Sequence, residues 1–588
     1  MEVTRVFDLL ANSKEKFSLV DMLAAKGPSG WKKHSTAEVI TKSNAISFAL
    51  MSKGVKKDDK IAIMSTNRPE WNFVDMGIMQ LGAITVPLYP TLAENDLAFI
   101  SKDAGIQIFF VENEVLYEKL NKVLKASAIT AEIYTFEKVT GASHYASINA
   151  SAAANNYEEL EARKAAVYPD DLLTLIYTSG TTGDPKGVML SHNNLVSNFK
   201  ASAALVPPET HRSLSFLPLS HIFERMVNYL YMYSGISIYY AENMDSIVAN
   251  LNEVNPSLFT TVPRLLEKVY DKIVSKGKEL KGIKKVLFFW ALDLGLRFEP
   301  EGKNGWFYET QLKIARKLVF VKWQAALGGS MKAIVSGGAA LQPRLARVFS
   351  AAGINVMEGY GLTETSPVIS VNTTASGFTR FGTVGKVIAE VTVKIASDGE
   401  IIVKGPNVMK GYYKHPEKTS EAIDAEGFFH TGDIGEIDAD GFLKITDRKK
   451  EIFKTSGGKY ISPGELENKF KESPFIEQML VLGEGQRFPS ALIVPAFEHL
   501  KSWAAFKGIE HLSNEALVKD ALVIEKYQKE IDEYNAEFGN WEQIKKFVLL
   551  SHEWSIDGGE MTPKLSVKRK VVMEKFKKEV ESIYAVIN

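Results

Sequence analysis

The amino-acid sequence predicts an α/β protein with a large N-terminal region and a smaller α+β domain at its C-terminal end. Three observations support this fold class. Strand-like and helix-like segments alternate over the first two thirds of the chain, short strands with Gly and Asp turns follow from about residue 382, and a charged break near residue 447 precedes a second alternation. We expect two α/β subdomains and a small β-barrel-like unit in residues 1–446, and the α+β domain in residues 447–588.

The composition is that of an ordinary globular protein without cysteine. The chain of 588 residues is too long for one hydrophobic core, and its 45% hydrophobic and 24% charged residues are typical values. A net charge of −1 provides no positive electrostatic field that would attract nucleic acid, which we therefore do not expect as a partner. The lack of cysteine excludes disulfides, thiolate nucleophiles and cysteine-ligated zinc. Neither a signal peptide nor a membrane-spanning apolar run occurs, so we expect a cytoplasmic protein.

The first 176 residues show the alternation that is typical of a parallel sheet covered by helices. A helix ends near Gly54 and leads into a strand, whereas residues 146–156, rich in Ala, Ser and Asn, are predicted to be an exposed connection. The other predicted elements are strands at 83–90, 106–111 and 171–176, and helices that end near Gly82 and span 114–125.

The alternation continues to about residue 380, with one inserted segment. Strands are predicted to begin at Leu258, Met331 and Asn355, and helices at Met226 and Arg264. The insert, residues 268–323, mixes basic and aromatic residues with helical signals. Its surface could contact a membrane or a partner, although a solvated helical face is the favoured interpretation. Later segments are a hairpin turn at 438–441 and a mainly helical stretch at 497–541.

Residues 177–187 have the composition of a phosphate-binding loop, and helical signals resume only after them. Glycines let backbone N–H groups approach an anion, hydroxyls donate hydrogen bonds, and lysine adds a positive charge. The order differs from the common nucleotide loop, because Pro185 precedes the lysine and Gly187 follows it. Taken alone, a Gly/Thr-rich surface turn is an equally good interpretation. The candidate phosphate ligands are Thr178, Ser179, Gly180, Thr181, Thr182, Gly183 and Lys186.

Three further glycine-containing segments are predicted at strand ends, where open α/β sheets bind ligands: Ser336-Gly337-Gly338, residues 359–364 and Thr431-Gly432-Asp433. Tyr360 between two glycines offers a ring face for a purine, and Thr363 a donor to phosphate. Glu364 offers a hard oxygen to Mg²⁺, and Asp433 with Arg448 can bind ribose hydroxyls. His221 has no metal partner at ligand spacing, so we interpret it as a core or pocket-wall residue.

Five segments in this order resemble the AMP-forming acyl-CoA synthetases, and the resemblance covers nearly the whole chain. The Leu217-Pro-Leu-Ser-His-Ile-Phe-Glu-Arg form and the helical insert are most similar to the long-chain fatty acid branch. The resemblance implies ATP, Mg²⁺ and coenzyme A as cofactors. The segments are residues 177–186, 217–225, 358–364, 431–433 and 447–454.

The resemblance also implies a mechanism in two steps. A carboxylate attacks the α-phosphate of ATP to give an acyl-adenylate and pyrophosphate, and the thiol of CoA then displaces AMP. Residues of 177–186 would hold the β- and γ-phosphates, Thr178 and Glu364 would flank Mg²⁺, and His221 would line the acyl-carboxylate and pantetheine region. The nucleoside would be held by Gly337, Gly338, Tyr360, Asp433 and Arg448.

Members of the family rotate the C-terminal domain between the two steps, about a hinge two residues after the ribose arginine. In this sequence the hinge lies near 447–451, with Lys450 at that position, and the domain beyond it would be mobile. Gly458 would then reach the pantetheine tunnel. A solvated linker is compatible with the same Lys-Lys-Glu run.

The C-terminal end departs from the family pattern. The branch commonly has Thr-Pro-Thr-x-Lys-x-Lys-Arg, whereas this chain has Ser566 at the position of the adenylation lysine. Either Lys564 or Lys568 replaces that lysine, or the cation comes from elsewhere. We expect Lys564, since it lies in the same loop directly after Pro563.

The sequence therefore predicts an enzyme that activates a long-chain fatty acid to acyl-CoA with ATP and CoA. Alternatives are an acyl-AMP ligase that loads a carrier protein, a synthetase for another carboxylic acid, and, because of Ser566, a non-catalytic lipid- or partner-binding relative. Chain-length preference and oligomeric state stay open. Peripheral contact with the inner membrane face also stays open.

Overall fold

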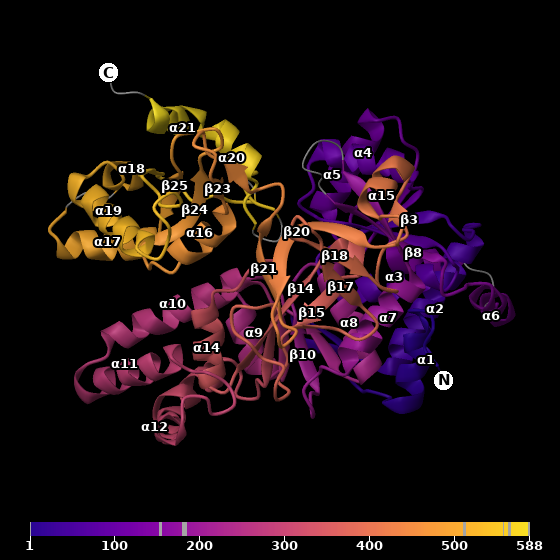
Figure 1. The fold of residues 1–588 in the computed structure, drawn as a ribbon. Coiled ribbons are helices and arrows are strands. Elements are labelled where there is room, and N and C mark those ends of the chain that lie inside the picture. The colour runs from indigo at the N-terminus through magenta and orange to yellow at the C-terminus, as the bar shows by residue number, and fades with distance from the viewer. Residues whose placement is uncertain are drawn as a thin grey trace.

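A computed structural model of the chain describes residues 2–151, 156–178, 185–509, 513–556, 558–562 and 566–585. The predicted fold class is confirmed: a large N-terminal α/β region is followed by a smaller C-terminal unit (Figure 1). The division at residue 447 and the hinge stay predictions. Among the described residues, no helix combines the length and apolarity needed to cross a bilayer.

The first large sheet contains the predicted parallel strands of the N-terminal end. Its strand order is β19-β9-β8-β4-β3-β5-β6-β7, and β4 pairs in parallel with both β3 and β8. Its strands are β3 (Lys60–Met64), β4 (Ile84–Leu88), β5 (Ile108–Val111), β6 (Glu132–Thr135), β7 (Ser143–His144), β8 (Leu172–Thr178), β9 (Lys186–Ser191) and β19 (Gly411–Tyr412). The helices of this part are α1 (Asp8–Lys16), α2 (Thr36–Ser52), α3 (Pro69–Met79), α4 (Glu94–Ala104), α5 (Glu114–Ala126) and α6 (Tyr157–Ala165), with a 3₁₀ turn at Tyr145–Ser151 in the predicted connection.

The second large sheet has the order β16-β15-β14-β13-β12-β10-β11-β1-β2. In it β1 pairs in parallel with the sequence-distant β11, with Leu23 opposite Ile238, and β2 forms the sheet edge by pairing with β1. Its strands are β1 (Leu23–Gly27), β2 (Gly30–His34), β10 (Arg212–Ser215), β11 (Ser237–Tyr240), β12 (Leu258–Thr261), β13 (Ala333–Ser336), β14 (Asn355–Gly361), β15 (Val368–Val371) and β16 (Lys386–Val387). The helices of this part are α7 (His192–Ala203), α8 (Ile222–Ser234), α9 (Ile247–Val254) and α14 (Pro343–Ala351), and the insert adds α10 (Pro263–Glu279), α11 (Gly282–Leu296), α12 (Trp306–Ala315), the π-helical turn η2 (Arg316–Phe320) and α13 (Val321–Ala326).

The predicted antiparallel unit is a four-stranded sheet of order β17-β18-β20-β21, whose outer strands do not pair with each other. Two sequence interpretations are corrected here. Thr431-Gly432-Asp433 lies inside β20 rather than at a strand end, and the charged break begins as a strand, because β21 pairs with β20 up to Arg448. The unit comprises β17 (Thr392–Ile395), β18 (Glu400–Lys404), β20 (Phe429–Ile437) and β21 (Leu443–Arg448), with α15 (Pro416–Ala422) nearby in sequence.

The C-terminal unit has its own apolar core, which includes Phe453, Leu492, Tyr527 and Ile583. Its strands are the hairpin β22 (Phe453–Lys454) and β23 (Tyr460–Ile461) and the three-stranded sheet of β24 (Ile476–Leu482), β25 (Ser490–Pro495) and β26 (Lys546–Leu549). Its helices are α16 (Pro463–Phe470), α17 (Phe497–Phe506), α18 (Asn514–Leu517), α19 (Ala521–Asn535), α20 (Arg569–Lys575) and α21 (Lys577–Tyr584).

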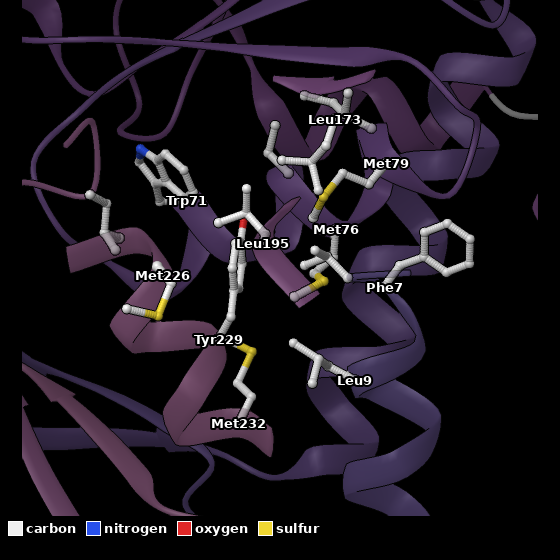
Figure 2. Packing of buried hydrophobic residues seen from close by; sticks show 14 of the residues in the cluster. Phe7, Leu9, Trp71, Met76, Met79, Leu173, Leu195, Met226, Tyr229 and Met232 are labelled. Atoms are coloured by element: carbon white, nitrogen blue, oxygen red, sulfur yellow. The ribbon is translucent and has the colours of Figure 1, made fainter. Parts of the chain in front are cut away.

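Helix α8 is anchored between the two large sheets. Figure 2 shows Met226, Tyr229 and Met232 of α8 near Trp71 of α3 and Leu9 of α1. Within the same core, the fully buried guanidinium of Arg225 on α8 forms a 2.5 Å ion pair with the carboxylate of Asp75 on α3. Breaking a buried pair leaves an uncompensated charge, so this contact fixes the position of α8 and of the residue that begins it.

Candidate active site

A cleft of about 2670 Å³ lies between the N-terminal region and the C-terminal unit. Its walls come from the β8–β9 hairpin, α8, the segment after β13, β14, β20 and β21, and the C-terminal segment around Thr562 and Ser566. Its lining residues extend along the chain from Tyr89 to Val571. The predicted site residues that line it are Thr178, Lys186, His221, Gly337, Gly338, Tyr360, Thr363, Glu364, Asp433, Arg448, Lys450 and Lys568.

The candidate phosphate loop connects two paired strands. Thr178 is the last residue of β8, Lys186 is the first of β9, and the two are partners in the antiparallel register. The sequence interpretation missed β9, because it placed only a loop before the next helix. The remaining candidate residues of the loop lie outside the described part of the chain: Ser179, Gly180, Thr181, Thr182 and Gly183.

Lys186 lies in an environment that suits a residue that binds an anion. Burial lowers the pKa of its ammonium group, and the neighbouring Lys418 and Lys450 lower it further. Glu364 and Glu421 oppose this lowering of the pKa, and a bound phosphate would add further negative charge beside the three lysines. The Lys186 Nζ atom also lies 5.2 Å from the ring centroid of Tyr412.

Tyr412 joins the phosphate side of the cleft to the predicted metal ligand. Its hydroxyl donates a 3.0 Å hydrogen bond to Glu364 Oε1, and its ring faces Lys186. β19 holds Tyr412 there through its register with β9, in which Tyr412 is opposite Val188. Tyr412 could not be predicted from the sequence, because its contact with Glu364 spans 48 residues and a Gly-Tyr pair before a helix gives no signal of its own.

The segment after β13 needs glycine for two separate reasons. Gly338 has φ = +81°, a left-handed conformation that side chains other than glycine rarely adopt. A Cβ atom on Gly337 would lie 3.2 Å from the ring of Phe223. The segment's end is held by Glu358, whose Oε1 accepts a 2.9 Å hydrogen bond from the Leu341 amide.

Glu358 was also missed as a site residue. It is 7% exposed, it lines the cleft, and burial raises the pKa of its carboxyl to about 8. The folded protein therefore keeps this carboxyl protonated near neutral pH, whereas an unfolded chain ionises it near its ordinary value.

Replacing Glu358 by glutamine is expected to change the pH dependence of stability. The folded-state pKa of Glu358 is raised, so its stabilising contribution is full below pH ~4.5 and is lost as pH rises through about 8. The free energy of unfolding of the wild type, relative to Glu358→Gln, should therefore fall between pH 5 and 8, by at most about 1.4 kcal/mol per pH unit. Urea unfolding across this range measures the difference, and parallel curves for the two proteins would contradict it.

The predicted nucleoside residues form a connected group across two sheets. The Tyr360 hydroxyl donates a 2.6 Å hydrogen bond to Asp433 Oδ2, and Arg448 Nε lies 3.3 Å from Asp433 Oδ1. Burial raises the pKa of Asp433, and Arg448 opposes that rise. The carboxylate is thus shared between a ring at the end of β14 and an exposed guanidinium at the end of β21.

His221 lines the cleft as the residue that caps α8. Its Nδ1 atom accepts a 3.1 Å hydrogen bond from the Phe223 amide. In the neutral imidazole the proton therefore resides on Nε2, which can donate to an oxygen atom. This agrees with the interpretation of a pocket-wall histidine.

The chain around the predicted hinge is fixed on one side. Lys449 Nζ lies 2.6 Å from Asp398, in the turn between β17 and β18, and 2.8 Å from Glu400, the first residue of β18. Lys450 follows directly and lines the cleft. Gly458 lies between β22 and β23 and is not among the described residues that line the cleft.

The C-terminal segment faces the cleft instead. Thr562 and Ser566 both line it, and the Thr562 amide donates a 2.8 Å hydrogen bond to the Ser566 carbonyl. Lys564 lies outside the described residues. Lys568 is exposed and precedes α20, and its amide donates a 2.7 Å hydrogen bond to the Glu560 carbonyl.

The family model described as AMP-binding enzyme matches residues 10–413, and the model described as AMP-binding enzyme C-terminal domain matches residues 450–588. The chain belongs to the AMP-binding enzyme family. Its acyl-CoA ligases use ATP, Mg²⁺ and CoA. This bears out the resemblance that the five sequence segments indicated.

Two relatives illustrate the similarity to characterised members of this family. The chain is 34% identical to a long-chain-fatty-acid–CoA ligase of Mycobacterium bovis over 563 residues, which cover 94% of this chain and 92% of the relative. It is 33% identical to long-chain-fatty-acid–CoA ligase 1 of Homo sapiens, over 94% of this chain and 82% of the relative.

Solved structures agree on the fold. The A domain of the carboxylic acid reductase from Segniliparus rugosus, in complex with AMP and a co-purified carboxylic acid, superposes with a TM-score of 0.75 at 20% identity, over 99% of this chain and 94% of that chain. O-succinylbenzoate coenzyme A synthetase from Bacillus subtilis, in complex with AMP, gives a TM-score of 0.67 at 20% identity, over 96% and 97%.

Proposed function

We propose that this protein activates a long-chain fatty acid to its CoA thioester through an acyl-adenylate, with release of AMP and pyrophosphate. One observation carries the proposal: a single cleft joins the predicted nucleotide residues to a long apolar wall. The names of the relatives point to the same acid class.

The apolar wall follows one face of α8. Phe223, Met226, Val227, Leu230 and Tyr231 line the cleft, and their spacing of three and four residues brings them to one side of the helix. Eight residues along a helix rise by roughly 12 Å, which matches an extended chain of many methylene groups. The wall continues with three residues at the end of α7: Ser202, Leu205 and Val206.

His221 marks the polar end of this wall. Because α8 begins there, a carboxylate bound near the Nε2–H of His221 leaves the acyl chain to run along the helix. Burying each methylene group contributes about 0.8 kcal/mol. An acid with a long apolar chain therefore gains more from this cleft than a small or polar acid.

In the first step, a carboxylate oxygen bonds to the α-phosphorus of ATP as the bond to pyrophosphate breaks. Lys186, with the hydroxyls and amides of the adjacent loop, would hold the departing phosphates. Thr178 and Glu364 would hold Mg²⁺, which neutralises phosphate charge. One carboxylate and one hydroxyl fit an ion that takes few protein ligands and binds chiefly through phosphates and water. The described residues contain no cluster of three His, Asp or Glu that would suggest a dedicated metal cage.

The nucleoside would lie between the segment after β13 and β20. Gly337 and Gly338 leave room for the base, the ring of Tyr360 offers a stacking face, and Asp433 with Arg448 would accept and donate hydrogen bonds at the ribose. Thr363, which is 6% exposed, would donate to phosphate. In the second step the CoA sulfur bonds to the acyl carbon, its proton leaves, and AMP departs.

The second step would follow a rotation of the C-terminal unit. Lys449 is anchored to Asp398 and Glu400, which supports a pivot directly after it, at Lys450. Among the described residues, the ion pair of Arg264 with Glu477 and the hydrogen bond from Gln342 to the Lys471 carbonyl join the two units and would have to break. Gly458 would then approach the pantetheine arm of CoA.

An acid panel tests the proposal. Purified protein is given ATP, Mg²⁺, CoA and one acid at a time, and AMP and thioester are measured together. We expect AMP and thioester in equal amounts, with long-chain fatty acids as the best substrates. Adenylate without thioester would favour a carrier-protein acceptor, and preference for a small or aromatic acid would favour another synthetase. No acid-dependent ATP consumption would support a non-catalytic relative.

A further inference from the structure

The helical insert carries a concentrated share of the exposed apolar surface. Within the described part of the chain, seven of the 22 exposed large hydrophobic side chains lie in residues 283–321. Single exposed side chains are normal on any globular protein, but their concentration in 39 residues indicates an interaction surface. The seven are Ile283, Val286, Trp306, Phe307, Ile314, Leu318 and Val321.

Four of these side chains form a stripe on one helix. α12, η2 and α13 are continuous over residues 306–326. Phe307, Ile314 and Leu318 are separated by seven and four residues, so they share a face. Val321 follows three residues later, after the wider π-helical turn. Each of the four is between 47% and 64% exposed.

The opposite face of the same helix is already covered. Leu312, Ala315, Phe320 and Trp323 are buried in the core cluster of this part of the protein. The helix is therefore held in place by its inner face, while about half or more of each side chain in the outer stripe is exposed. Packing against the protein's own core cannot explain the exposed stripe.

Basic side chains border the stripe. Lys313, Lys317 and Lys322 are exposed, and none forms an ion pair with another described residue. Residues 281–322 contain nine Lys and Arg against four Asp and Glu, whereas the whole chain has a net charge of −1. Two of these four carboxylates are engaged in ion pairs with arginines. The insert is thus a local basic region on an otherwise balanced protein.

The insert lies apart from the cleft. Among the described residues, none between Leu258 and Val335 lines the cleft, and α11 and α12 lie at the outer edge of the molecule, at the lower left of Figure 1. The stripe is therefore not an extension of the candidate active site.

We propose that Phe307, Ile314, Leu318 and Val321, flanked by Lys313, Lys317 and Lys322, dock this protein on an anionic lipid surface. Apolar side chains of an amphipathic helix insert between headgroups and acyl chains, and lysines at the border attract anionic headgroups. Trp306, which is 80% exposed at the start of the helix, belongs to the residue type that is enriched at the headgroup level. The proposal thus favours membrane contact of the insert over the solvated helical face that the sequence alone favoured.

A lipid surface suits this stripe better than a protein does. The stripe is the outer face of a single helix. A bilayer can bury such a face without the shape complementarity that a protein partner needs. If the proposed function holds, docking would bring the enzyme close to its substrate, since long-chain fatty acids partition into bilayers. It does not depend on that function, because docking needs neither ATP nor an acid.

Vesicle co-sedimentation tests the proposal. The full-length protein is mixed with vesicles of phosphatidylcholine alone, or of phosphatidylcholine with phosphatidylglycerol, without nucleotide or fatty acid. We expect partition onto the anionic vesicles that weakens at high salt. Replacing the three lysines by glutamine should lower the partition coefficient by roughly 100-fold, at about fivefold per lysine. Phe307→Ser with Ile314→Ser and Leu318→Ser should lower it by at least ~10-fold.

A matched variant separates docking from general loss of apolar surface. Phe506→Ser with Leu522→Ser and Ile524→Ser removes three exposed side chains from the C-terminal unit and should bind vesicles as the wild type does. Thermal unfolding confirms that all variants are folded. Equal binding to neutral vesicles, no binding at all, or equal loss in the matched variant would overturn the proposal. So would a dimer, seen by analytical ultracentrifugation, that the stripe variant abolishes.

Discussion

Lys186→Ala is expected to lower acyl-adenylate formation by roughly 10²–10³-fold, the typical loss when one electrostatic donor to a transition state is removed. Lys186 is half-buried at the start of β9 and has no carboxylate partner among the described residues, so its charge is available to the departing pyrophosphate. Pyrophosphate release with acid and ATP measures the first step. Conversion of supplied acyl-adenylate and CoA to thioester measures the second, and it should stay within a few-fold of wild type.

Two variants control this experiment. Lys186→Arg keeps the charge and should retain more of the first step than alanine does. Lys414→Ala removes a more exposed lysine, 53% exposed and paired with Asp103, from the same part of the fold and should leave both steps unchanged. Equal losses of both steps in Lys186→Ala would contradict an assignment of this lysine to adenylation alone.

The sequence predicted those parts of the site that short segments encode. Gly338, Tyr360 and Glu364 could be proposed because residue type and neighbours already suggest their chemistry, and the structure brings them into one cleft. Tyr412 and Glu358 could not. Their importance arises from contacts with Glu364 and Leu341, and neither contact is visible in local sequence.

Strand boundaries were harder to predict than strand existence. β9 was missed because its short apolar run after Gly187 leads directly into α7. The run was therefore interpreted as a loop before the helix and not as a strand. Thr431-Gly432-Asp433 was placed at a strand end because glycine usually interrupts strands. In the structure β20 continues through it, and a register shift between Ile434 and Gly435 accommodates the irregularity.

The exposed stripe of the insert shows a different limit. Residues 306–326 are apolar on two faces, and periodicity alone does not tell which face the protein covers. The core takes Leu312 and Trp323, whereas Ile314 and Leu318 stay outside. Only the tertiary packing of α11, α12 and α14 decides between them.

Lys564→Ala is expected to lower acyl-adenylate formation by roughly 10²–10³-fold while the conversion of supplied acyl-adenylate to thioester persists. The residues on both sides of the undescribed positions, Thr562 and Ser566, line the cleft and are joined by a hydrogen bond. A lysine in the same segment can therefore supply the cation that Ser566 lacks. Single-turnover formation of acyl-adenylate, measured without CoA, reports this step alone.

Two further variants decide which lysine acts. Lys568→Ala should have a small effect, because Lys568 is exposed and directly precedes α20. Ser566→Lys places a lysine where the family commonly has one, so it should restore much of the lost rate in the Lys564→Ala protein. Full adenylate formation by Lys564→Ala would show that its cation is dispensable. A large loss in Lys568→Ala would instead assign the first step to Lys568, and failure of Ser566→Lys to rescue would mean that the charge must come from position 564 itself.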